Sequence, residues 1–412
     1  MTSDVTDKRF ILPAEVREAI DRLCGAGYEA FIVGGCVRDT LLGRPVSDFD
    51  MTTSAAPEET AAVFKDCRVI KTGMKHGTVT VLIDGIPLEI TTYRTDGAYS
   101  DGRHPDSVSF TASLEEDLAR RDFTVNAMAY HPAVGLVDRF GGLADLDRKL
   151  IRCVGDPQRR FSEDALRILR ALRFASVLSF SIEEATLAAA IGLRDNLRAV
   201  SAERIYAEVT KFICGGGADA LLPSANSVLA SAVAPLASYD AAAWAGTARR
   251  LSRVPRDGAP RYAALFADLS DADAARAAEL LKMDTKTRDA VLAAHRLRDV
   301  PLPTSAPEAR ELLRRGGKDA AETSLLVREA SGEPGAAEAR RLVRDVIERG
   351  DAYTVRMLAI SGSDLVKLGI PAGKEVGDTL ERLLDEVIAG RLPNERSTLG
   401  ASCKKPPDPQ KP

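Results

Sequence analysis

The sequence predicts an α+β protein: a small mixed-sheet head followed by an all-helical neck, body and tail. Two observations carry this prediction. Short segments that alternate in polarity or are rich in β-branched residues are concentrated in the first 142 residues. From Leu143 onward, the apolar residues recur with helical spacing. We expect a head at 1–142, a neck at 143–217, a body at 218–348, a tail at 349–395 and a disordered end at 396–412.

Composition limits the classes of protein that remain. The chain has 412 residues, of which 45% are hydrophobic, enough for roughly two to four domains. Its net charge of −4 and pI of about 5.8 mean that any RNA site must be a local basic patch. The six cysteines and four histidines are scattered, which does not fit a zinc site or a disulfide framework. The polar start and the lack of an 18-residue apolar run predict a cytoplasmic protein with no membrane partner.

Residues 31–54 contain a strand-to-helix corner suited to phosphate. An apolar strand at 31–33 ends at Gly34 and Gly35, and a short helix at 36–42 follows. Two glycines at such a corner let backbone N–H groups approach a phosphate chain, which the positive end of the helix dipole also attracts. A pair of glycines alone is usually only a turn.

Two carboxylates follow on the next expected strand. Asp48 and Asp50 are two residues apart, so on a strand both point to one face. Two hard oxygen ligands suit Mg²⁺, which keeps positions for phosphate oxygens. A third carboxylate, Glu89, lies inside an apolar strand at 88–93. It is either an outward-facing strand residue or a third acidic group near the first two.

A local basic patch lies at residues 152–173, where six arginines face three acids. Arg167, Arg170 and Arg173 recur every three residues and therefore share one face of a helix. On spacing alone this is a salt-bridged, solvated helix face. Asp164 lies beside Arg167 on that helix, and the pair offers an acceptor and a donor side by side.

In their order, the strand, Gly34-Gly35, the helix with Arg38 and the Asp48/Asp50 pair resemble the signature of the DNA polymerase β nucleotidyltransferase superfamily. The fuller form resembles class II tRNA nucleotidyltransferases, the CCA-adding enzymes, and the related bacterial poly(A) polymerases. The resemblance covers roughly the first 215 residues strongly and the last helical segment moderately. It implies Mg²⁺ as cofactor, with Asp48 and Asp50 as catalytic metal ligands and Glu89 as a candidate third carboxylate. It also implies these nucleotide-binding residues: Gly34, Gly35, Arg38, Arg121, Asp122, Asp164, Arg167, Arg170 and Arg173.

The resemblance makes Asp164 and Arg167 a base-reading pair. Cytosine and adenine each present an amino donor beside an unprotonated ring nitrogen, which match an aspartate acceptor and an arginine donor. Uracil and guanine present the opposite order and leave both protein groups mismatched. Arg121 would then lie near the nucleotide and Asp122 at the ribose, with Arg170 and Arg173 at the triphosphate.

Residues 94–110 are polar, rich in glycine and too irregular for a regular element. The segment resembles the flexible loop of the CCA-adding family, which is needed there for the final adenosine addition. The matching residues are Arg94, Asp96, Tyr99, Asp101, Arg103 and His104. Because the loop is intact, we expect addition of A as well as C.

These features predict template-independent addition of CMP, CMP and AMP from CTP and ATP to the 3′ end of tRNA, with release of pyrophosphate. The tail would contact the acceptor and T arms through glycine turns at 361–394. A poly(A) polymerase or A-adding enzyme is the alternative within the family, and a non-catalytic RNA-binding protein is the alternative from another class. The acidic composition and the segment KTGMKHGTVTV favour the CCA-adding form. The oligomeric state is not predicted.

Overall fold

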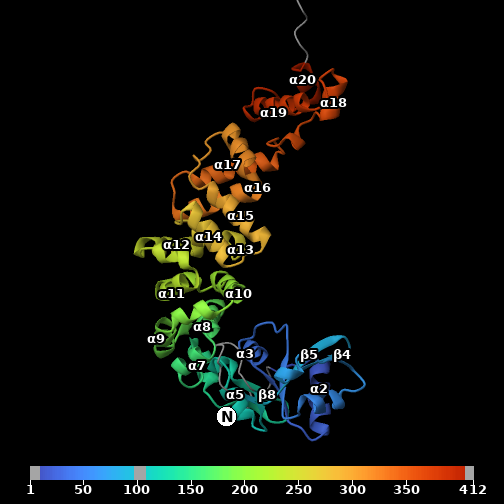
Figure 1. Cartoon of the computed structure of the whole chain (residues 1–412), viewed down its shortest axis with the longest axis vertical. Helices are drawn as coiled ribbons and strands as arrows, with labels where there is room; N and C mark the ends of the chain where they lie inside the picture. The colour runs from blue at the N-terminus through green and yellow to red at the C-terminus, as the bar shows by residue number, and fades with distance from the viewer. Residues whose placement is uncertain (1–9, 97–107, 404–412) are drawn as a thin grey trace, which may run out of the picture. The chain divides into compact units, whose positions relative to one another are not determined.

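A computed structural model describes residues 10–96 and 108–403 of the chain. The chain divides into two compact units, Met1–Ala237 and Ser238–Pro412. In Figure 1 the first unit is coloured from blue to green and the second from yellow-green to red. Each unit has its own buried apolar side chains, such as Ile32 and Phe123 in the first and Tyr262 and Leu313 in the second.

The first unit is organised around a seven-stranded mixed sheet. Its spatial order is β3 (Arg68–Ile70), β4 (Thr78–Ile83), β5 (Ile86–Thr92), β2 (Asp50–Thr53), β1 (Ala30–Val33), β8 (Met128–His131) and β9 (Gly135–Asp138). Only β2 and β5 run parallel, and every other neighbouring pair is antiparallel. The apolar strand β1 is buried along its whole length. The predicted mixed sheet is therefore confirmed.

Among the described residues, five helices belong to this sheet region, some of which can be followed in Figure 1: α2 (Ala14–Gly25), α3 (Gly35–Leu41), α4 (Pro57–Val63), α5 (Leu114–Ala119) and α6 (Gly142–Asp147). Helix α2 buries Val16, Ala19, Ile20 and Leu23, which recur with the spacing of one helix face. These helices cover apolar strand residues and leave the carboxyl-bearing start of β2 open.

Two expectations for the first unit need correction. Residues 94–110 are not wholly irregular, because β6 (Arg94–Asp96) and β7 (Val108–Phe110) pair as an antiparallel ribbon. Asp48 does not lie on a strand, because β2 begins only at Asp50 and Asp48 belongs to the extended segment before it. Strand pairing with β1 begins at Met51, so nothing holds Asp48 in the sheet ladder.

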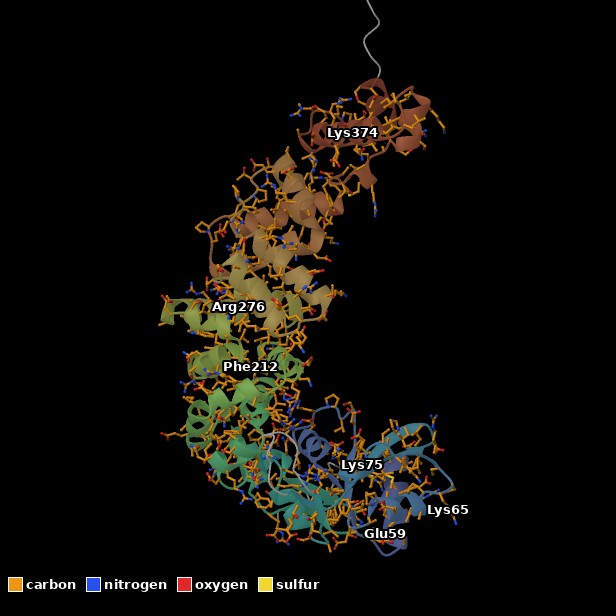
Figure 2. All side chains as sticks on the ribbon, in the orientation of Figure 1. Glu59, Lys65, Lys75, Phe212, Arg276 and Lys374 are labelled. Carbon is orange, nitrogen blue, oxygen red and sulfur yellow. The ribbon has the colours of Figure 1, made fainter. Side chains whose placement is uncertain are left out.

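The rest of the first unit is mainly helical: α7 (Pro157–Glu163), α8 (Leu166–Leu178), α9 (Glu184–Gly192), α10 (Ala202–Ile213) and α11 (Ala218–Ala232). The departure from all-helical structure in this region is a parallel pair of two-residue strands, β10 (Leu150–Ile151) and β11 (Ser181–Ile182). Helix α10 packs on α8, where Ser176 Oγ donates to the carbonyl of Phe212 at 2.7 Å. Phe212 lies among these helices in Figure 2.

The second unit consists of helices: α12 (Ala241–Arg253), α13 (Gly258–Phe266), α14 (Asp271–Leu280), α15 (Thr285–Arg296), α16 (Ala306–Ser331), α17 (Ala336–Glu348), α18 (Gly362–Lys367), α19 (Lys374–Ile388) and α20 (Arg396–Ala401). Helix α16 is kinked at Gly317, whose φ of 76° breaks the helical path. Residues 396–401, expected to start a disordered end, form α20 because Leu399 is buried in the last apolar cluster. No described helix is long and apolar enough to cross a membrane.

Candidate active site

One cleft of about 450 Å³ in the first unit collects every residue that we expected to bind the nucleotide. Its lining residues are Gly34, Gly35, Arg38, Asp50, Arg120, Arg121, Asp122, Asn126, Asp164, Leu166, Arg167, Arg170, Arg173, Phe174 and Arg204. Arginines outnumber carboxylates in this lining, so the cleft is a strongly positive site within an acidic protein. Such a site suits a polyanion such as a triphosphate.

The corner between β1 and α3 forms one wall of the cleft. Gly34 has φ 80° and ψ −126°, a conformation that favours glycine. A Cβ at this position would also approach Nη1 of Arg121 to 3.1 Å. Behind the corner, Arg38 is buried and donates from Nη1 to Oδ1 of Asn126 at 2.5 Å. Asp39 accepts from the other side of the same guanidinium, which fixes its plane.

Of the three acidic candidates, Asp50 and Glu89 lie on neighbouring strands of the sheet, and Asp48 lies in the segment before β2. Asp50 begins β2 directly beside Glu89 of the parallel strand β5. Partial desolvation raises the pKa of Asp50, the negative charges of Glu89 and Asp48 raise it further, and Arg121 acts in the opposite direction. Asp48 is exposed, accepts from Ser47 Oγ at 2.9 Å and does not line the cleft. Within residues 10–96 and 108–403, no three acidic, histidine or cysteine side chains converge as a ready metal cluster.

The chemistry of these carboxylates nevertheless fits a divalent cation. Like charges held side by side on adjacent strands repel each other, and a bound cation removes that repulsion. The register places Asp50 and Glu89 as direct partners, so Glu89 is not simply an outward residue far from the first two. Its role as a ligand stays a prediction.

Asp122 is buried and fully engaged in this structure. Its Oδ2 accepts from Nε and Nη2 of Arg170 at 2.8 and 2.5 Å, and its Oδ1 accepts from Asn126 at 3.1 Å and from the backbone N–H of Phe123 at 2.9 Å. Although burial acts in the opposite direction, the Arg170 charge and these hydrogen bonds lower the pKa of Asp122 to about 2. The pair connects the sheet region to helix α8.

The two members of the predicted base-reading pair each have a separate counter-ion. Asp164 ends α7 and accepts from the backbone N–H of Leu166 at 3.0 Å and from Nη2 of Arg204 at 3.1 Å. Arg167 donates from Nη1 to Glu163 at 2.7 Å and from Nη2 to the carbonyl of Arg120 at 3.3 Å. Both side chains still line the cleft.

Three arginines of the cleft lining surround the ring of Phe174. The guanidinium carbons of Arg38, Arg170 and Arg173 lie 5.2, 5.4 and 4.0 Å from its ring centroid. Arg173 Nε lies 3.0 Å from a carboxylate oxygen of Glu208, but the two are not aligned as a hydrogen bond. Desolvation lowers the pKa of Arg173, and Glu208 opposes this effect. Three cations are therefore clustered near one aromatic ring in this part of the cleft.

Asp117, which we did not predict, connects several parts of the site. It is fully buried on α5 and accepts from Arg120 at 2.8 Å, from Arg121 at 3.3 Å and from Thr52 Oγ1 at 3.2 Å. The backbone N–H of Arg94, at the base of the β6–β7 ribbon, donates at 3.4 Å to Oδ1 of Asp117, the oxygen that also accepts from Arg120. Its i+3 and i+4 spacing to the two arginines was a signal that could have found it. Asn126 and Arg204 carried no comparable local signal.

The predicted flexible loop is described only at its base. Arg94 donates from Nη1 to the carbonyl of His76, and Asp96 lies on β6 by its backbone. The remaining predicted loop residues, Tyr99, Asp101, Arg103 and His104, lie outside the described residues.

The fold and the cleft together define the class: a nucleotidyltransferase with a mixed-sheet head. The family profile described as "Poly A polymerase head domain" matches residues 30–152. The profile "Probable RNA and SrmB- binding site of polymerase A" matches 179–223, and "tRNA nucleotidyltransferase domain 2 putative" matches 257–402.

Full-length relatives identify the family. The chain is 37% identical over 405 residues to the CCA-adding enzyme of Limosilactobacillus fermentum, covering 94% of this chain and 96% of the relative. It is 35% identical over 407 residues to that of Streptococcus mutans, covering 94% and 96%. The solved structure of the Bacillus stearothermophilus CCA-adding enzyme in complex with CTP is 33% identical with a TM-score of 0.77, over 95% of this chain and 97% of that one. The chain belongs to the CCA-adding enzymes, a family of metal-dependent tRNA nucleotidyltransferases.

Proposed function

We propose that this chain adds CMP, CMP and AMP in turn to the 3′ end of tRNA, using CTP and ATP and releasing pyrophosphate, in the cytoplasm. The observation that carries the proposal is the single cleft that holds Asp50, the Asp164/Arg167 pair and a row of arginines. Similarity to CCA-adding enzymes over nearly the whole chain supports it.

Asp48 and Asp50 would hold two Mg²⁺ ions, with Glu89 beside them as a further carboxylate. When bound, such ions would lower the pKa of the primer 3′-hydroxyl and stabilise the leaving pyrophosphate. The chain's own contribution is orientation and charge: Arg121, Arg170 and Arg173 would neutralise the triphosphate, and Gly34 would leave room for it. This proposal needs no protein side chain as general base.

Asp164 and Arg167 would select the base without a nucleic-acid template. The carboxylate accepts from the exocyclic amino group of cytosine or adenine, and the guanidinium donates to the adjacent ring nitrogen. Uracil or guanine would place a carbonyl against the carboxylate and an N–H against the guanidinium, which leaves buried polar groups unpaired.

The decisive experiment supplies purified protein with tRNA lacking its 3′ end, Mg²⁺ and each labelled nucleotide separately. We expect CMP incorporation from CTP alone and AMP incorporation only after both cytidines are present. Asp50→Asn should lower both activities roughly a hundredfold or more while tRNA binding persists, because a metal ligand is lost. Glu58→Gln, an exposed carboxylate on α4, is the matched control that should stay active.

Two outcomes would contradict the proposal. Long A tails made from ATP without prior CMP addition would instead identify a poly(A) polymerase. Wild-type turnover in Asp50→Asn would remove Asp50 from the metal site.

A further inference from the structure

Arg204 belongs to the cleft although it comes from another helix than the base-reading pair. It lies on α10, which is held in place by the buried side chains of Ile205, Val209 and Phe212. From there Nη2 donates to Oδ2 of Asp164 at 3.1 Å and lies 3.5 Å from Oδ1. Arg204 thus brings a charged donor from α10 to the proposed acceptor of the base amino group.

Asp164 needs such support because of its place in the backbone. It is the C-cap of α7 with φ −141° and ψ 105°, between two helices, so no helical turn restricts its side chain. The backbone N–H of Leu166 holds only Oδ1, at 3.0 Å. Arg204 supplies the main contact to Oδ2. A carboxylate has about four lone-pair sites, so sites remain for the amino group of a base.

The identity of the partner also matters for selectivity. Arginine carries only donors and remains charged, so it can pair with the Asp164 carboxylate and keep it oriented as an acceptor. Without that contact, the Asp164 carboxylate could rotate away from the base edge or pair with Arg167. Rejection of uracil depends on a fixed acceptor facing its carbonyl.

We infer that Arg204 is a specificity-determining positioning residue that holds the Asp164 carboxylate in its base-reading orientation. This inference rests on the proposed function, since it concerns the choice among CTP, ATP, UTP and GTP in that same cleft. Arg204 does not touch the reacting phosphate; it acts through Asp164.

The test measures kcat/KM for all four nucleotides with Arg204→Met and Arg204→Gln, which remove the charge but keep much of the stem, and with Arg204→Lys, which restores a charged donor. For the first two variants, we expect the preference for CTP over UTP to fall about tenfold or more, as expected for a lost charged hydrogen bond. Arg204→Lys should recover part of that preference. Lys211→Met removes an exposed charge from the same helix outside the cleft and should leave the preference unchanged.

The result that overturns the inference is an unchanged CTP-to-UTP ratio, or an equal loss for all four nucleotides, in a variant whose Tm shows that it is folded. Using two charge-removing variants keeps the test valid if one of them fails to fold. The wild-type assay separates this outcome from failure of the proposed function. A wild-type protein that adds no CMP to tRNA refutes the proposed function. If the wild type is active and the variants lose activity equally with all nucleotides, only the role of Arg204 is refuted.

Discussion

The buried carboxylate of Asp122 in the cleft is paired with Arg170, and this pair makes the stability of the fold depend on pH. The pKa of Asp122 falls to about 2 from an ordinary value of 3.8. A lowered folded-state pKa stabilises the fold fully above about pH 4 and loses that stabilisation as the pH falls toward 2. The contribution is on the order of 2 kcal/mol.

We therefore expect Asp122→Asn to be less stable than the wild type at neutral pH, and this difference to shrink as the pH is lowered from about 5 to 3. Urea midpoints across that range measure it. Asp195→Asn, which removes an exposed carboxylate paired with Arg198, provides the comparison. A constant difference between wild type and Asp122→Asn at every pH would show that the pair contributes no ionisation-linked stability.

The base-reading pair yields a second prediction at the residue scale. Arg167→Ala should raise KM for both CTP and ATP and relax the rejection of UTP, because the group that repels a ring N–H is lost. Asp164→Ala should weaken both good substrates by about ten- to hundredfold in kcat/KM. If these residues only bind RNA, the variants would instead lower tRNA affinity in a salt-dependent way and keep nucleotide selectivity.

Residues that act with near neighbours in the chain could be predicted, and residues that act across the fold could not. Gly34 occurs in a compact pattern whose chemistry is visible in one stretch, whereas the roles of Asp122 and Arg170 were predicted from the resemblance to family motifs. Arg204 meets Asp164 only because α10 packs against α8. No spacing in one sequence reveals such a meeting.

At the scale of elements, the head strands were predicted because polarity alternation and β-branched residues mark them. The strand boundaries that were not predicted depend on which strands pair with each other. Asp48 falls outside β2 because the ladder with β1 starts at Met51. Residues 94–96 and 108–110 form strands by pairing with each other, although neither is long or apolar enough to signal a strand alone.

The β6–β7 ribbon leads to a prediction about the segment that it carries. Deleting residues 99–105 should leave CMP addition largely intact and stop AMP addition, because the segment resembles the family loop that we expect to be needed for the final adenosine addition. The measurement is incorporation of each nucleotide on tRNA substrates ending before the first C and after the second. Equal loss of both activities, with the fold intact by circular dichroism, would contradict a switching role.

At the scale of the whole molecule, we expect the two compact units to have separable tasks: the first binds the nucleotide, and the second contributes contacts to tRNA. A fragment of residues 1–237 contains the complete cleft and its own core, so it should fold and bind CTP with near wild-type affinity. Its KM for tRNA should rise about tenfold or more, because the phosphate contacts expected from the tail are gone. Nucleotide binding by calorimetry and tRNA kinetics check both statements. An unchanged KM would remove the second unit from tRNA binding.

The parallel pairing of β2 with β5 has a consequence for how the enzyme matures. Parallel neighbours need a crossover, and here the chain runs through α4, β3 and β4 before Glu89 can meet Asp50. Such non-local closure is slow compared with forming a helix or a hairpin. A slip of one residue in this register would also turn Glu89 to the opposite side of the sheet. On refolding, helical structure should therefore return first, and catalytic competence should wait for this single strand pairing.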